Sequence, residues 1–281
     1  MTRFSDVVSP AELSERLGTP ELRVVDCRAS LQDPLAGRAA YEQGHVPGAV
    51  FADLLDDLSG PIVAGRTGRH PLPEIEAFVD RLRSWGIARS SQVVAYDDAG
   101  GAFAARLWWM LRWLGHDGVA VLDGGYAAWL AEQRPVTTEI PSPARGEFSA
   151  APRAAWLVTS TELAAAQSIA RKLFDARAPE RFRGEVEPID PVAGHIPGAV
   201  NLPFAANLRD GRFLAPAELR ERFARALGDT APQDAIVYCG SGVTACHDLL
   251  AFARAGLPIP RLYAGSWSEW ITDPARPVER G

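Results

Sequence analysis

Cys239 is the residue of this chain whose type and surroundings best suit covalent chemistry. It is followed by the run Gly240-Ser241-Gly242-Val243-Thr244-Ala245 and then by a stretch with helical character. Two glycines allow a tight loop to curl around the sulfur with backbone N–H groups pointing inward. A helix that begins directly after the loop adds the positive end of its dipole. Both effects stabilise a thiolate, so Cys239 is predicted to be a nucleophile and not an inert buried thiol.

The residues after the cysteine argue against a phosphatase. That chemistry needs an arginine six residues after the cysteine to clamp the phosphate oxygens, and here the position holds Ala245. Gly240 and Ser241 are also neutral, so a dianionic phosphate would meet no fixed cation within the loop. The two other cysteines, Cys27 and Cys246, lack such a loop and are interpreted as packing residues. Three cysteines are too few, and odd in number, for a disulfide framework.

The chain also contains its own repeat. The run GHVPGAV at 44–50 recurs as GHIPGAV at 194–200. Further matches follow in the same order: 24–28 with 172–177, 93–97 with 235–239, and 124–129 with 265–270. A spacing of roughly 140 to 150 residues is too long for a solenoid and fits two tandem copies of one domain. We predict domains at 1–135 and 155–281, joined by a proline-containing linker at 136–154.

Within each copy, short apolar runs alternate with amphipathic stretches. Strands are predicted at Leu22–Asp26, Val93–Tyr96, Val119–Leu122, Lys172–Asp175, Ile236–Cys239 and Arg261–Tyr263. Helices are predicted at Pro73–Trp85, Ala104–Leu114, Ser160–Gln167, Pro216–Leu227 and Thr244–Ala255. This pattern indicates an α/β fold in which each domain is a parallel sheet with helices on both faces. Cys239 then lies at the carboxyl end of a central strand, where open α/β sheets form their sites, and Asp97 holds the matching place in the first copy.

Composition limits the partners of the protein. The 281 residues carry a formal net charge of -6 and 47% hydrophobic residues, which is ordinary for a globular protein without general attraction to nucleic acid or anionic membranes. No apolar run reaches the roughly 18 to 20 residues that span a bilayer, and the N-terminus lacks the apolar region of a signal peptide. Five scattered histidines form no zinc-type cluster. We therefore expect a cytoplasmic protein that binds no nucleic acid, membrane or metal.

The loop Cys-Gly-Ser-Gly-Val-Thr-Ala at 239–245 is similar to the active-site loop of the 3-mercaptopyruvate sulfurtransferases. These are tandem-domain members of the rhodanese superfamily. The resemblance covers essentially the whole chain and includes the runs at 45–49, 108–110, 122–125, 195–199 and 265–270. It implies two rhodanese-like domains, the first of which is catalytically silent. Asp97 fits that pattern, because the silent copy often carries aspartate at the cysteine position.

The resemblance further implies a two-step transfer of a sulfane sulfur that needs no cofactor. The Cys239 thiolate takes the outer sulfur of a small-molecule donor and becomes a persulfide. A second nucleophile, which is a thiol, cyanide or a thioredoxin-like protein, then removes that sulfur. The loop residues Gly240, Ser241, Gly242, Val243, Thr244 and Ala245 would hold the anionic persulfide. Ser241 is also a candidate for bonding the donor or moving a proton.

The expected donor is 3-mercaptopyruvate, with thiosulfate as the alternative in a thiosulfate:cyanide sulfurtransferase. Thiosulfate-preferring relatives carry basic residues after the cysteine, whereas Gly240-Ser241 is typical of the mercaptopyruvate type. The family binds the donor carboxylate through an arginine in a segment that resembles 181–184. Arg181 is the better match and Arg183 the alternative. The family's second arginine is missing from the stretch Glu185–Asp190.

His45 is the residue that the resemblance assigns to proton transfer, with an acidic partner left open between Asp33 and Glu42. The same motif places His195 in the second copy. A structural role for both histidines is therefore the alternative. For the whole protein, the alternative is a non-catalytic rhodanese module that binds partners or senses redox state. The intact loop at Cys239 argues against it.

Overall fold

The computed structural model describes residues 3–166 and 172–281, and the chain forms two compact units. The first comprises Met1–Gly60, Pro73–Arg153 and Asp210–Phe213, and the second comprises Pro61–Leu72, Ala154–Arg209 and Leu214–Gly281. The predicted boundaries differ from these units in three places: residues 136–153 of the predicted linker belong to the first unit, and the segments 61–72 and 210–213 are exchanged. The segment 61–72 brings side chains from the N-terminal half of the chain into the second unit.

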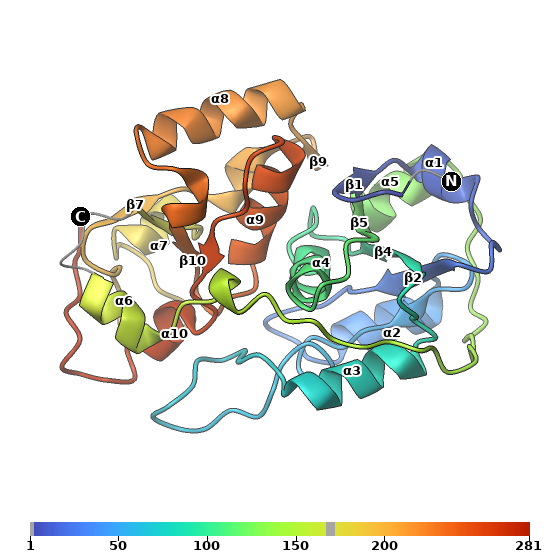
Figure 1. The fold of residues 1–281 in the computed structure, drawn as a ribbon, viewed down its shortest axis with the longest axis horizontal. Coiled ribbons are helices and arrows are strands. Elements are labelled where there is room, and N and C mark those ends of the chain that lie inside the picture. Colours follow the sequence, from blue (N-terminus) through green and yellow to red (C-terminus); the bar gives the residue numbers. More distant parts are fainter. Residues whose placement is uncertain (1–2, 167–171) are drawn as a thin grey trace. The chain divides into compact units, whose positions relative to one another are not determined.

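A five-stranded parallel sheet forms the first unit, with strand order β1-β5-β4-β2-β3. Its strands are β1 (Val7–Val8), β2 (Leu22–Asp26), β3 (Val50–Phe51), β4 (Gln92–Tyr96) and β5 (Val119–Leu122). Its helices are α1 (Pro10–Ser14), α2 (Ala36–Gln43), α3 (Ile75–Ser84), α4 (Ala104–Trp113) and α5 (Gly125–Ala131), as Figure 1 shows. The strands and helices predicted for this copy are confirmed to within two residues at each end.

The core of the first unit lies on both faces of this sheet. On one face, Val24, Val94 and Leu122 form a buried cluster with Leu13 of α1 and Trp129 of α5. All positions of β4 are buried, as expected for a central strand covered on both sides. This is why the strand has a continuous apolar sequence and no alternating pattern.

The second unit repeats this architecture on a four-stranded parallel sheet of order β11-β10-β6-β7. Its strands are β6 (Leu173–Asp175), β7 (Ala199–Asn201), β10 (Ile236–Tyr238) and β11 (Arg261–Leu262). Its helices are α6 (Ser160–Ala166), α7 (Pro179–Phe182), α8 (Pro216–Leu227), α9 (Ala245–Arg254) and α10 (Ser266–Trp270). In Figure 1, α8 and α9 lie on one side of this sheet, and α6 and α10 on the other.

Shorter elements complete the chain. They are the 3-10 helices η1 (Ala154–Trp156), η2 (Phe204–Asn207) and η3 (Pro232–Asp234), and the two-residue strands β8 (Leu208–Arg209) and β9 (Arg212–Phe213). The helix predicted at Ser160–Gln167 is found as α6, and Gln167 lies outside the described residues. Among the residues that the structure describes, no helix is long and apolar enough to cross a membrane.

The two sheets share one strand order, since β5-β4-β2-β3 corresponds to β11-β10-β6-β7. Asp97 follows β4 and Cys239 follows β10, so the two residues occupy equivalent strand ends. The predicted fold class, two tandem α/β domains with parallel sheets, is confirmed. A buried ion pair also repeats, with Arg28 on Asp26 and Arg177 on Asp175, each at 2.6 Å. In each copy this ion pair holds the turn that follows β2 or β6, which is the strand beside the central strand.

A buried carboxyl group lies within the first turn of α9. Asp248 is fully buried, and its Oδ1 accepts a hydrogen bond of 2.6 Å from Nδ2 of Asn207. Arg222 donates to Oδ1 of the same asparagine at 3.1 Å. Burial raises the pKa of Asp248 to about 7, while the bond from Asn207 and the charge of Arg222 act in the opposite direction.

Asp248 should make the protein less stable as the pH rises from about 4 to about 7. In that range the unfolded chain has lost this proton and the folded chain keeps it, so folding binds a proton and stability falls with rising pH. Asp248→Asn cannot titrate. The unfolding free energy of wild type relative to this variant should drop by about 2 to 3 kcal/mol between pH 5 and pH 7, at about 1.4 kcal/mol per pH unit. Urea unfolding of both proteins measures this, and a difference independent of pH would contradict it.

Candidate functional site

Cys239 lies directly after β10 and begins the loop that leads into α9. Its side chain is buried, and the backbone N–H of Gly242 donates to Sγ at 3.1 Å. Gly242 has φ +79°, and a Cβ at this position would lie 2.1 Å from the carbonyl oxygen of Ala264. Only glycine fits there, so the second glycine of the loop is required by the geometry that turns its N–H toward the sulfur.

The turn that leads into α10 fixes the start of the loop. The N–H of Cys239 donates to Oγ of Ser266 at 3.1 Å, and the N–H of Trp267 donates to the carbonyl of Cys239 at 3.0 Å. Ser268 donates to the carbonyl of Gly240 at 2.9 Å. These bonds hold the backbone on both sides of the sulfur, so the thiol has a fixed position before any ligand binds.

The segment Pro61–Leu72 packs against this same turn. A Cβ on Gly68 would lie 2.6 Å from both the carbonyl oxygen of Gly265 and Oγ of Ser268, so the two backbones are in close contact. The N–H of Arg69 donates to Oγ of Ser268 at 3.1 Å. This contact places the side chains of residues 69 and 70 beside the loop.

His70 and Ser241 form a hydrogen-bonded pair, and Ser241 is the second residue after Cys239. Nδ1 of His70 lies 2.7 Å from Oγ of Ser241, and both side chains are buried. A histidine bonded to a hydroxyl can accept or deliver a proton through it. Sequence reasoning selected Ser241 and missed His70, which follows an arginine in a glycine-containing loop without motif or periodicity.

Two guanidinium groups lie over the loop. A Cβ on Gly240 would be 3.1 Å from Nη2 of Arg69 and 3.6 Å from both Nη atoms of Arg181. Arg183 instead pairs with Glu185 at 2.7 Å, and both of these side chains are largely exposed. Of the two predicted substrate-binding arginines, the structure therefore brings Arg181 to the loop. Arg69 is a second cation at the site that the sequence did not reveal.

His45 lies in the first unit and makes local contacts. Its ring stacks on Tyr41 at 3.9 Å, and its Nδ1 and Nε2 lie 2.8 and 3.0 Å from the carbonyl oxygens of Tyr41 and Glu139. His195 repeats this arrangement, with its ring 3.8 Å from Phe182 and its Nδ1 2.8 Å from the Phe182 carbonyl. Both histidines thus pack the same turn in their own copies. The catalytic assignment of His45 stays a prediction.

In the first unit, the loop equivalent to the Cys239 loop holds the carboxylate of Asp97. This carboxylate is fully buried and accepts backbone N–H bonds of 2.8 to 2.9 Å from Ala99, Gly101, Phe103 and Ala104. Burial raises the pKa of Asp97, and these N–H groups act in the opposite direction. The loop after the central strand is therefore a nest of N–H groups built around an anion.

The other two cysteines are held differently. Burial, with Asp26 and Asp97 nearby, raises the pKa of Cys27 well above its ordinary value, so this thiol is a poor nucleophile. Cys246 lies on α9 with its Sγ 3.4 Å from the carbonyl oxygen of Gly242. Among the described residues, all cysteines are free thiols.

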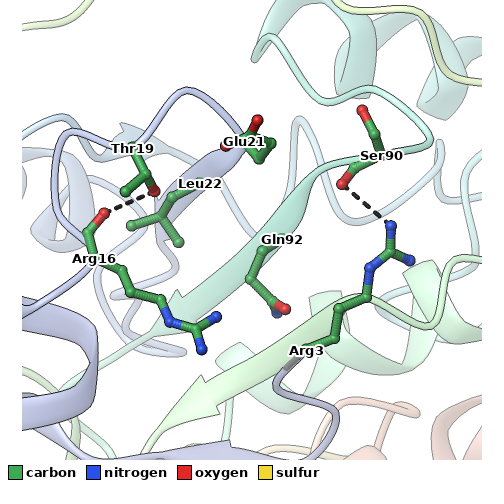
Figure 2. A pocket seen from close by; sticks show the side chains of 7 residues that line it. All are labelled: Arg3, Arg16, Thr19, Glu21, Leu22, Ser90 and Gln92. Atoms are coloured by element: carbon green, nitrogen blue, oxygen red, sulfur yellow. Dashed lines mark hydrogen bonds between the residues drawn. The ribbon is translucent and has the colours of Figure 1, made fainter. Parts of the chain in front are cut away.

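A separate cavity of about 420 Å³ lies in the first unit (Figure 2). It is lined by Arg3, Arg16, Thr19, Glu21, Leu22, Ser90 and Gln92. Leu22 and Gln92 begin β2 and β4, so this cavity lies at the amino ends of these strands. Asp97 follows the carboxyl end of β4, and the cavity is therefore not the first unit's counterpart of the Cys239 loop.

Comparison with known proteins gives one consistent family. The model of the rhodanese-like domain matches residues 9–132 and 159–273. A Pseudomonas aeruginosa protein named "Probable 3-mercaptopyruvate sulfurtransferase" is 52% identical over 280 residues, covering 99% of each chain. Mouse thiosulfate sulfurtransferase is 40% identical over 267 residues, covering 92% of this chain and 87% of its own. The crystal structure of SseA from Escherichia coli, a 3-mercaptopyruvate sulfotransferase, superposes with TM-score 0.81 and 34% identity, covering 95% of this chain and all of that one.

Gly242→Ala is expected to disrupt the loop far more than Gly198→Ala. Both glycines have positive φ, +79° and +75°, so both variants carry the cost of a left-handed backbone, about 1 to 2 kcal/mol. Only at 242 does the added methyl meet backbone, whereas nothing lies within 4 Å of a Cβ at 198. Gly242→Ala should lose at least about 2 kcal/mol more stability and alter the alkylation rate of Cys239. Equal effects in thermal unfolding and alkylation would contradict this reading of the loop.

Proposed function

Because this chain belongs to the rhodanese family and is a sulfurtransferase, we propose that it takes its sulfur from 3-mercaptopyruvate and carries it as a Cys239 persulfide. Thiosulfate is the competing donor, and relatives named for each donor align with most of the chain. The choice between the two donors rests on the chemistry of the residues around Cys239.

The two donors differ in their need for a proton. When the Cys239 thiolate attacks the sulfur of mercaptopyruvate, the S–S bond forms, the C–S bond breaks, and the electron pair stays on carbon as the enolate of pyruvate. The proton released by the donor thiol must then reach that carbon to give pyruvate. When the same thiolate attacks thiosulfate, the leaving group is sulfite, which needs no proton to depart.

The hydrogen bond between His70 and Ser241 carries the proposal for mercaptopyruvate. Ser241 is the second residue after Cys239, and the pair can take the proton from the donor thiol and return it to the enolate carbon. A thiosulfate enzyme has no use for such a pair. The proposal therefore gives the proton-transfer role to His70 through Ser241, in place of His45, whose ring nitrogens face backbone carbonyls.

Asp97 supports a persulfide at Cys239. A persulfide extends from Cβ through Sγ to a terminal anionic sulfur, just as the aspartate side chain extends from Cβ through Cγ to an anionic oxygen. The first unit holds such an anion with backbone N–H groups after its central strand. We infer that the loop of the second unit accepts the terminal sulfur in the corresponding place, with Gly242 as the donor to Sγ.

The acceptor takes the terminal sulfur in the second half-reaction. Cyanide leaves as thiocyanate, a thiol leaves as its own persulfide, and both restore the Cys239 thiolate. We propose a thiol acceptor, either a small molecule or a thioredoxin-like protein, with cyanide as its simplest substitute. The free thiols Cys27, Cys239 and Cys246 favour a reducing compartment, in keeping with the predicted cytoplasmic location.

Cys239→Ser should abolish sulfur transfer, and Cys27→Ser should retain most of it. The hydroxyl cannot form the persulfide, whereas the Cys27 thiol lies in the first unit with a pKa raised by burial. Mass spectrometry after one turnover with mercaptopyruvate should find one added sulfur on Cys239, and pyruvate release should match it. If wild type forms the persulfide from neither donor, the proposed function is wrong. Faster loading from thiosulfate than from mercaptopyruvate would reverse the choice of donor.

Ser241→Ala and His70→Ala should separate the two donors. Each variant should lower kcat with mercaptopyruvate by about 100-fold or more, the usual contribution of a general acid or base. The double variant should lose no more than the worse single one, because the two residues act as one unit. Persulfide formation from thiosulfate should change by less than about tenfold. Equal losses with both donors would show that the pair supports the loop and does not transfer the donor proton.

A further inference from the structure

We infer that Arg69 is a donor-binding residue that works with Arg181 to hold the carboxylate of the sulfur donor over Cys239. This inference rests on the proposed function. It gives a second cation to a site whose sequence lacks an arginine in the stretch Glu185–Asp190. The cation comes from Pro61–Leu72, the segment that joins the second unit from the N-terminal half of the chain.

Asp190 positions both guanidinium groups. Its Oδ2 lies 3.3 Å from Nη2 of Arg181, and its Oδ1 forms an ion pair with Nη1 of Arg69. The Asp190 side chain is 3% exposed, so its charge is compensated almost entirely by these two arginines. The position of Arg69 is therefore set by a buried carboxylate and not by chance packing at the surface.

The ion pairs continue inward from Arg181. Glu187 binds Arg181 at 2.6 Å and Arg177 at 3.3 Å, and Arg177 binds Asp175 at the end of β6. Charges of opposite sign thus alternate from the central sheet to Arg69, which ends the series beside the loop. Such a series restrains each guanidinium without a ligand, so little side-chain entropy is lost when an anion binds.

The guanidinium groups of Arg69 and Arg181 that face the loop are accessible to a sulfur donor. The side chain of Arg69 is 27% exposed and that of Arg181 is 17% exposed, whereas their carboxylate partners are buried. Arg69 directs Nη1 to Asp190 and has Nη2 nearest to Gly240. Burial lowers the pKa of Arg69, and the nearby Cys239 acts in the opposite direction, in keeping with a guanidinium close to the sulfur. Two planar groups at one place suit a carboxylate attached to the donor sulfur through a short carbon chain.

Alkylation of Cys239 tests this inference without any sulfur donor. Iodoacetate carries a carboxylate and iodoacetamide is its neutral analogue, and both lose iodide to the thiolate. Arg69→Ala should slow carboxymethylation of Cys239 by about 10-fold or more, the loss expected for a charge-assisted contact, and leave the iodoacetamide rate within about twofold. Arg69→Lys should recover part of the iodoacetate rate. Arg66→Ala, an exposed arginine of the same segment, is the matched control and should change neither rate.

Steady-state kinetics give the second readout. Arg69→Ala should lower kcat/KM for mercaptopyruvate by about 10- to 100-fold, mostly through KM, as Arg181→Ala should. The inference fails if Arg69→Ala leaves the ratio of the two alkylation rates unchanged, or if both rates fall together, which would mark Arg69 as a support of the loop. The alkylation rates need no sulfur donor, so a failure of this inference is distinguishable from a failure of the proposed function, which is tested by persulfide formation on wild-type Cys239.

Discussion

Both units place a side chain that accepts backbone N–H bonds at the carboxyl end of a central parallel strand. In the first unit this side chain is that of Asp97, held by backbone N–H groups of the loop that follows β4. In the second unit Cys239 occupies the equivalent strand end, with Gly242 donating to its sulfur. A buried anion is tolerated only where dipoles are already directed at it. In both copies, the sheet, the glycine-containing turn and the following helix direct these dipoles at the strand end.

The sequence was sufficient to predict the sheets because a central strand covered on both faces needs an unbroken apolar run, as in Val93–Tyr96 and Ile236–Tyr238. It was also sufficient to select Cys239 as the candidate nucleophile, since the glycines around it have a local physical reason. His70 could not be found in this way. Its place depends on Gly68 meeting the backbone of Gly265, a contact between distant segments that leaves no periodicity in either one.

The repeat explains why His45 stands out in the sequence and His70 does not. His45 and His195 stand out because their motif occurs twice, and both rings pack against the turn of their own copy. Residues that are present in both copies serve the fold that the copies share. The residues to which the proposed function gives a chemical role occur in one copy only, as Cys239 does, or lie in the segment Pro61–Leu72, which belongs to the second unit.

In the proposed reaction, the polar and charged groups around Cys239 have different roles in the two half-reactions. Backbone N–H groups stabilise the thiolate and the persulfide, which occur in both halves, and they add no net charge to the loop. The guanidinium groups of Arg69 and Arg181 are the proposed partners of the donor carboxylate, which leaves after the first half-reaction. Asp190 and Glu187 compensate most of their charge. A monoanionic carboxylate then fits this site better than a dianion would, so the same buried carboxylates that position the arginines also favour mercaptopyruvate over thiosulfate.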